Sequence, residues 1–179
     1  MTKEQIKEFC KYLLKQVKNY SIYVWGGQGE LLMETPLVKI KAMETGNTNF
    51  KRVVKLVNTH VQCDRDLSAS RLFDCSGLGV YWLLKNGIIH SDMTADTMYS
   101  KCTKKSLDKI KKGDWVFKVT TKQSKDRDGR PITVEYATHI GYVVDDDKTI
   151  VEAYGRDKGV ISAKLGNGSA FNKAGTFNG

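Results

Sequence analysis

The chain has 179 residues, a hydrophobic fraction of 40% and only two prolines, which suits one globular domain and excludes a disordered protein. No apolar run approaches the roughly 20 residues needed to cross a bilayer, so we expect no membrane insertion. The net charge of +9 suits an anionic partner. The lysines are spread along the whole chain and no nucleic-acid-binding motif occurs, so we do not expect that partner to be nucleic acid.

The N-terminal segment predicts an amphipathic helix over residues 2–20, because apolar residues recur there at intervals of three and four. Thr2 and Gln5 fit a capping box at its start. Cys10 lies on the apolar face and is expected in the core. The four cysteines show no close CxxC pairing, so a disulfide-stapled scaffold is not expected.

The segment after the glycine-broken stretch YVWGG (23–27) has the weakest pattern. Residues 28–70 contain one predicted helix near 48–59, with apolar side chains on one face, and residues 60–70 are polar and predict a loop.

The stretch RLFDCSGLGVYWLLKNG (71–87) predicts a second helix over residues 75–86, closed by Gly87 in a left-handed conformation. Cys75 lies at its start, where partial positive charge and free N–H groups favour a thiolate and can face a developing oxyanion. The alternative from this stretch alone is a small apolar residue that packs the beginning of a helix.

A third helix is predicted at about 93–101, and the remainder of the chain favours β-structure. Strands are expected in WVFKVT, ITVEYATHIGYVV, TIVEAY and GVISA, separated by turns at KDRDGRP and DDDK. Helices followed by an antiparallel sheet define an α+β fold. The glycine-rich residues 166–179 predict a linker or a frayed end.

A cysteine nucleophile needs a neighbouring base, and imidazole has a suitable titration range. His139 lies inside a predicted strand, whereas His60 and His90 lie in polar, loop-like surroundings. His139 is therefore the candidate base.

An acceptor on the second imidazole nitrogen commonly orients a catalytic histidine. If DDDK forms a hairpin turn that pairs Val144 with Thr149, then Gly141 pairs with Glu152. Gly141 and His139 face the same side of the sheet, so Glu152 lies diagonal to His139 and within reach of it. A register slip of one residue would turn Glu152 to the other face.

Four segments together resemble the NlpC family of papain-like cell-wall hydrolases. They are YVWGG, FDCSGLGVYWLLKNG, KKGDWVF and THIGYVVDDDKTIVEA, and they occur in the family order. The resemblance implies a papain-like fold and a catalytic Cys75, with His139 as general base. The family's third position usually holds histidine, asparagine or glutamine, so Glu152 is a departure; Tyr154, which shares its face, is the alternative.

The resemblance also implies that Tyr23, Asp74 and Ser76 hold substrate, although Tyr23 has a buried structural role as its alternative. We expect a single catalytic domain over residues 1–165, followed by the tail. Residues 28–70 would be an insertion near the substrate groove that forms a lid, a specificity wall or a surface decoration.

The implied activity is a cysteine endopeptidase that cleaves an amide bond of the peptidoglycan stem peptide through a thioester, without metal or cofactor. The alternatives are an N-acetylmuramoyl-L-alanine amidase of the same fold and a non-catalytic cell-wall-binding module. A metal site built from His60, Cys63, Cys75 and Cys102 is a further alternative.

We expect a monomer that acts at the bacterial cell wall. The first residues show no signal-peptide pattern and the tail is rich in glycine. This combination fits a phage lysin released from the host cytoplasm, and a secreted hydrolase without its leader fits as well.

Overall fold

The computed structural model describes residues 1–166 and 168–178. It begins with helix α1 (Lys3–Lys18), which confirms the first predicted helix. Thr2 and Gln5 form the expected capping box, with hydrogen bonds of 3.2 and 2.8 Å between the backbone of each and the side chain of the other. Cys10 is buried on the inner face of α1, as predicted.

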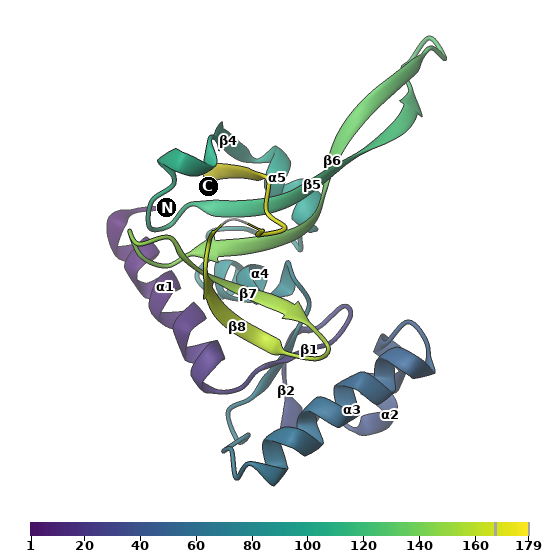
Figure 1. The fold of residues 1–179 in the computed structure, drawn as a ribbon, viewed down its shortest axis with the longest axis vertical. Helices are drawn as coiled ribbons and strands as arrows, with labels where there is room; N and C mark the ends of the chain where they lie inside the picture. The colour runs from purple at the N-terminus through teal and green to yellow at the C-terminus, as the bar shows by residue number, and fades with distance from the viewer. Residues whose placement is uncertain (167, 179) are drawn as a thin grey trace.

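A six-stranded antiparallel sheet forms the centre of the fold (Figure 1). Its strands follow the order β4 (Cys102–Lys105), β9 (Lys173–Phe177), β5 (Trp115–Lys125), β6 (Pro131–Val143), β7 (Thr149–Gly155) and β8 (Gly159–Lys164). Helices first and an antiparallel sheet afterwards confirm the α+β class. The far parts of β5 and β6 continue beyond the body as a long two-stranded ribbon (Figure 1).

The prediction of a linker or frayed end over residues 166–179 is wrong for Lys173–Phe177. This segment is strand β9, which pairs with β4 on one side and with β5 on the other. Phe177 stacks on Trp115 with ring centroids 4.4 Å apart. A Cβ added at Gly175 would lie 2.6 Å from the Cβ of Cys102, so this glycine allows two strands to approach closely.

Residues 28–70 form a separate layer that is built on a small three-stranded sheet. The sheet has the order β1 (Ile22–Tyr23), β3 (Arg71–Phe73) and β2 (Gln28–Leu31), with β1 and β3 parallel. The 3-10 turn η1 (Leu32–Glu34) follows β2, and then come α2 (Leu37–Met43) and α3 (Asn47–Gln62). Helix α3 confirms the prediction near 48–59 and extends into the segment predicted as a loop.

Helix α3 lies beside α2 at the lower end of the molecule in Figure 1. The layer has a core of its own, formed by eight buried side chains: Ile22, Val24, Leu32, Ile40, Val53, Leu56, Leu67 and Leu72.

The remaining helices pack on one face of the large sheet. Helix α4 (Gly77–Lys85) ends before Gly87, which has the predicted left-handed conformation with φ of +65°. Helix α5 (Ala95–Ser100) agrees with the third predicted helix, and a 3-10 turn, η2 (Leu107–Lys109), leads into β5. The main core lies between this face and helices α1, α4 and α5. None of the described helices is long and apolar enough to span a membrane.

Candidate active site

Two glycines bring the YVWGG segment against the start of α4. A Cβ at Gly77 would overlap the carbonyl oxygen of Gly27, and a Cβ at Gly27 would lie 2.8 Å from the backbone of Leu72. The Asp74 N–H also donates to the Gly27 oxygen at 3.0 Å. The glycines of the two motifs therefore permit a backbone contact that places Tyr23 and Cys75 in one site.

Asp74 shapes the turn that presents Cys75. Its Oδ1 accepts a hydrogen bond from the Gly77 N–H at 2.6 Å and another from the Ser76 hydroxyl at 3.1 Å. A side chain that accepts from the first turn of a helix satisfies donors that the helix leaves unpaired. Burial raises the pKa of the Asp74 carboxyl, and these hydrogen bonds oppose that increase. Asp74 and Ser76 thus have a local structural role besides the substrate contact that was predicted.

Cys75 is partly exposed and lies in the turn just before α4, which begins at Gly77 and not at residue 75 as predicted. The backbone N–H groups of Cys75 and Ser76 lie near its sulfur and lower the pKa of the thiol. Burial has the larger effect, and with the charge of Asp74 it raises that pKa to about 11. The expected preference of the helix start for a thiolate is therefore outweighed, and the resting group at neutral pH is a thiol.

His139 and Glu152 form a close pair on adjacent strands. The Nε2 of His139 lies 2.6 Å from a carboxylate oxygen of Glu152, and the two side chains are 19% and 9% exposed. The predicted register is confirmed, because Val143 pairs with Ile150 and the Val144 N–H donates to the Thr149 oxygen. Strand alternation then places both side chains on one face, as predicted.

Tyr154, the alternative orienting residue, is 52% exposed, and no hydrogen bond joins it to His139 among the described residues.

The thiol of Cys75 lies near the part of β6 that is not paired with β7. The paired residues of β6 and β7 end at Tyr142 and Val151, so the N–H of Ile140 is not used by that pairing, and this N–H lowers the pKa of the Cys75 thiol. Ile140 directly follows His139. In the described part of the chain, no hydrogen bond joins the thiol to the imidazole, and Nδ1 of His139 has no partner. The structure thus places the sulfur beside the histidine strand with the imidazole paired only to Glu152.

Tyr23 connects the thiol with the inserted layer. It is 8% exposed, and burial raises the pKa of its hydroxyl group, with further increases from Cys75 and Asp74. The guanidinium of Arg156, at the turn after β7, lies over the Tyr23 ring at 5.1 Å from its centroid. Tyr23 therefore lies within electrostatic range of both the thiol and an arginine.

The His139–Glu152 pair also borders a depression of about 810 Å³ on the other face of the sheet. Phe171 lines it and stacks on the imidazole at 5.6 Å. Cys75 and Tyr23 are not among its lining residues, since the thiol packs with the main core. The imidazole therefore faces this depression, whereas the thiol lies against the main core.

The alternative metal site is not assembled. His60 is buried and bonded to Arg65, Cys63 is exposed, and Cys102 is buried with its thiol directed to the Met98 oxygen. Among residues 1–166 and 168–178, no three His, Cys, Asp or Glu side chains are grouped as metal ligands.

Sequence reasoning missed four contributors to this site. Phe171 was assigned to an irregular tail, and Glu44 and Arg156 meet only through tertiary packing. The Ile140 N–H is a backbone group, which residue types cannot reveal. An arginine two residues beyond Tyr154 was visible, but nothing in the local pattern indicated its partner.

Comparisons with known proteins agree with this geometry. The sequence profile of the NlpC/P60 family matches residues 66–170, which is more than half of the chain. A sequence search of curated proteins found no match.

Among solved structures, the chain is similar to the peptidoglycan hydrolase RipB of Mycobacterium tuberculosis. The TM-score is 0.51 and the identity 13%, over 99% of this chain and 68% of that one. A lipoprotein-like NLP/P60 protein of Staphylococcus aureus gives a TM-score of 0.53 and 18% identity, over 99% and 42% of the chains. These likenesses concern the fold.

The P60 domain of an antigen from Mycobacterium avium subspecies paratuberculosis gives a TM-score of 0.47 and 17% identity, over 96% of both chains. RipD of M. tuberculosis, described as a non-catalytic NlpC/p60 domain protein adapted to a peptidoglycan-binding function, is also similar. It gives a TM-score of 0.47 and 13% identity, over 93% and 95% of the chains.

A helix that starts beside a cysteine, packed on an antiparallel sheet that carries a histidine, defines a papain-like α+β protein. The chain belongs to the NlpC/P60 family of peptidoglycan hydrolases. The family acts on the bacterial cell wall and includes members without catalytic activity.

Proposed function

We propose that this protein is a cysteine endopeptidase that hydrolyses an amide bond in the peptidoglycan stem peptide. The observation that carries the proposal is the 2.6 Å His139–Glu152 pair, together with a partly exposed Cys75 whose thiol pKa is lowered by the N–H of Ile140, the residue after His139. In this proposal Cys75, just before α4, is the nucleophile, His139 on β6 is the base, and Glu152 on β7 orients the base. This combination is the requirement for acyl transfer by a thiol.

In the proposed reaction, Nδ1 of His139 takes the proton of the Cys75 thiol while the sulfur attacks the substrate carbonyl. The N–H groups of Cys75 and Ser76 stabilise the oxyanion that forms. The imidazolium then gives its proton to the leaving amine as the amide bond breaks, and a thioester remains. His139 next removes a proton from water, which hydrolyses the thioester and regenerates the thiol.

Glu152 has two tasks in this scheme. Its hydrogen bond to Nε2 fixes the ring and leaves Nδ1 to take the proton, and its charge stabilises the imidazolium. The proton on the resting thiol makes the base essential, because burial holds the pKa of Cys75 at about 11. Neither step uses a metal or a cofactor.

We further propose that Tyr23, Asp74 and Ser76 contact the stem peptide. The exposed indole of Trp25 (54% exposed) adds an apolar surface beside them. The layer formed by residues 28–70 would then serve as a wall of the substrate groove, because it is joined to the turn after β7 near Tyr23. The protein would act as a monomer at the bacterial wall, as a phage lysin or as a secreted hydrolase.

A second candidate is a module that binds peptidoglycan without cleaving it. The observation that favours it is the high pKa of the Cys75 thiol together with the lack of a hydrogen bond to His139 among the described residues. Catalytic hydrogen bonds commonly tighten only when substrate binds, so this observation ranks second to the His139–Glu152 pair.

The test is digestion of purified peptidoglycan from several wall types, with mass spectrometry of the released fragments. Cys75→Ala serves as the matched control, and Cys63→Ser, at an exposed thiol far along α3, reports on nonspecific effects of thiol removal. We expect fragments from the unmodified protein and from Cys63→Ser only. New ends at the stem peptide would identify an endopeptidase, and a free lactyl group would identify the amidase.

Sedimentation with insoluble peptidoglycan distinguishes the second candidate. Binding by both the unmodified protein and Cys75→Ala, without released fragments, would identify a binding module. Release of equal fragments by both proteins would overturn the assignment of Cys75.

A further inference from the structure

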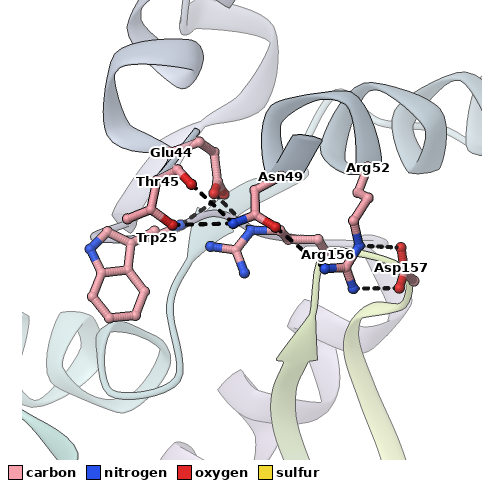
Figure 2. A network of polar contacts seen from close by, with 7 residues as sticks. All are labelled: Trp25, Glu44, Thr45, Asn49, Arg52, Arg156 and Asp157. Carbon is pink, nitrogen blue, oxygen red and sulfur yellow. Dashed lines mark hydrogen bonds and ion pairs between the residues drawn. The ribbon is translucent and has the colours of Figure 1, made fainter. Parts of the chain in front are cut away.

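Two ion pairs join the inserted layer to the turn between β7 and β8 (Figure 2). Arg52 of α3 contacts Asp157 at 2.5 Å, and both side chains are largely exposed, at 44% and 62%. Glu44, which follows α2, contacts Arg156 at 2.7 Å, and these side chains are 0% and 14% exposed. The two neighbouring pairs therefore differ in their environment.

The exposed Arg52–Asp157 pair is an ordinary surface contact. The buried Glu44–Arg156 pair is unusual, and its burial needs an explanation. Burying two charges removes them from water, and their mutual attraction commonly only offsets that cost. Glu44 also accepts a hydrogen bond from the Trp25 N–H at 3.1 Å. One carboxylate thus holds both Arg156 and the backbone of the YVWGG segment, beside the proposed groove.

Arg156 uses only part of its hydrogen-bonding capacity. Its Nε donates to Glu44, and in the part of the chain that the structure describes neither terminal nitrogen has a hydrogen bond or an ion pair. No dashed line reaches these two nitrogens in Figure 2. The guanidinium lies over the ring of Tyr23, whose hydroxyl interacts electrostatically with Cys75 and Asp74. The two free donors are therefore near the site and held in a fixed orientation.

We propose that Arg156 determines specificity by binding a carboxylate of the substrate through its two terminal nitrogens. Two parallel N–H groups match the two oxygens of a carboxylate. Glu44 is a positioning residue, which holds the guanidinium through Nε and leaves the other donors for the ligand. The inference rests on the proposed stem-peptide substrate.

The stem-peptide chemistry indicates which carboxylate this is. A glutamyl residue joined through its γ-carboxyl retains a free α-carboxylate close to the scissile amide. Some walls would present this group as an amide, which carries no charge and offers only one acceptor oxygen. Arg156 should therefore favour the acid over the amide. A hydrogen bond to a charged group contributes about 1.5–3 kcal/mol, which corresponds to a preference of roughly 10- to 100-fold.

The experiment compares two synthetic stem peptides that differ only in a free or amidated α-carboxyl of the γ-linked glutamyl residue. The unmodified protein, Arg156→Gln and Arg156→Lys are assayed for KM and kcat with both peptides. Arg52→Ala is the matched control, because it removes the neighbouring exposed ion pair and leaves Arg156 in place. The double variant Glu44→Gln plus Arg156→Gln avoids an unpaired buried carboxylate if the single variant folds poorly.

We expect the unmodified protein and Arg52→Ala to favour the acid peptide by roughly 10- to 100-fold in kcat/KM. Both Arg156→Gln and the double variant should lose this preference, mainly through KM, and Arg156→Lys should keep part of it. Equal losses on both peptides, or no preference in the unmodified protein, would overturn the assignment of Arg156.

A binding measurement separates this inference from the proposed activity. Both peptides are titrated calorimetrically into Cys75→Ala and into Cys75→Ala with Arg156→Gln. Tighter binding of the acid peptide that depends on Arg156 supports the inference even if no variant cleaves peptide. Absence of binding by either peptide, or binding that ignores Arg156, refutes it.

Discussion

The contact between Glu152 and His139 offers the most direct test of the proposed site. We compare Glu152→Gln, which keeps an oxygen that can accept from the imidazole, with Glu152→Leu, which removes the acceptor at similar volume. Both side chains of the pair are mostly buried and their atoms lie 2.6 Å apart, so the contact is close enough to hold the imidazole in one orientation. The family resemblance, with glutamine among the usual third residues, also leads us to expect the Gln variant to function.

The expected size of the effect follows from this geometry. A hydrogen bond to a charged group contributes about 1.5–3 kcal/mol, and misorientation of the ring adds to the loss, since removing the orienting acid of a related triad costs about 10⁴-fold. We expect Glu152→Leu to lower kcat by about 100- to 1,000-fold, or ~3–4 kcal/mol of barrier. Glu152→Gln retains orientation without the charge and should lose about 10-fold.

The assay is release of peptide fragments from peptidoglycan at fixed pH, with thermal unfolding of each variant measured in parallel. Glu135→Gln is the matched control, because Glu135 lies on β6, the strand that carries His139, but forms an exposed pair with Lys173. A folded Glu152→Leu protein that keeps activity within 3-fold of the unmodified chain would refute an orienting role. Equal losses in both Glu152 variants would attribute the effect to charge alone.

Three further predictions concern the thiol, the motif glycines and the last strand. The rate of alkylation of Cys75, measured by mass spectrometry of its peptide, should rise about tenfold per pH unit from pH 7 to 10. The reason is that its pKa is raised to about 11, so the thiolate is scarce below that pH. A rate that is constant below pH 8 would show a stabilised thiolate instead. Gly77→Ala should lower the free energy of unfolding by about 2 kcal/mol in denaturant titrations, because the added Cβ overlaps the Gly27 oxygen. Gly166→Ala, which has open space at its Cβ, should be nearly neutral. Equal changes in the free energy of unfolding for the two variants would contradict the close contact. Truncation after Leu165 should abolish cooperative thermal unfolding because it removes β9 from between β4 and β5, and an unchanged transition would show that the sheet does not need this strand.

Local patterns predicted the parts of the fold that depend on neighbours in sequence. The capping box of α1, the left-handed Gly87 after α4 and the tight turn before Thr149 each arise from a few adjacent residues. The His139–Glu152 contact was accessible for the same reason, since a short hairpin sets the register and strand alternation sets the face.

The missed features depend on segments that meet only after folding. Strand β9 resembles a flexible tail in sequence, although its Gly175 is required by the close approach to β4, a strand about 70 residues away in sequence. Glycine composition alone cannot distinguish a residue that must fit between two strands from one that bends freely.

Residue types and their order along the chain identified the thiol, the histidine and the family resemblance. Tertiary structure decided the charge state and the surroundings of those groups. The backbone N–H groups before α4 lower the pKa of Cys75, but burial raises it by a larger amount. Burial is a property of the whole fold. The pairing of Glu44 with Arg156 likewise joins residues 112 positions apart. Tertiary packing brings such pairs together, and the residues next to each member in sequence do not indicate its partner.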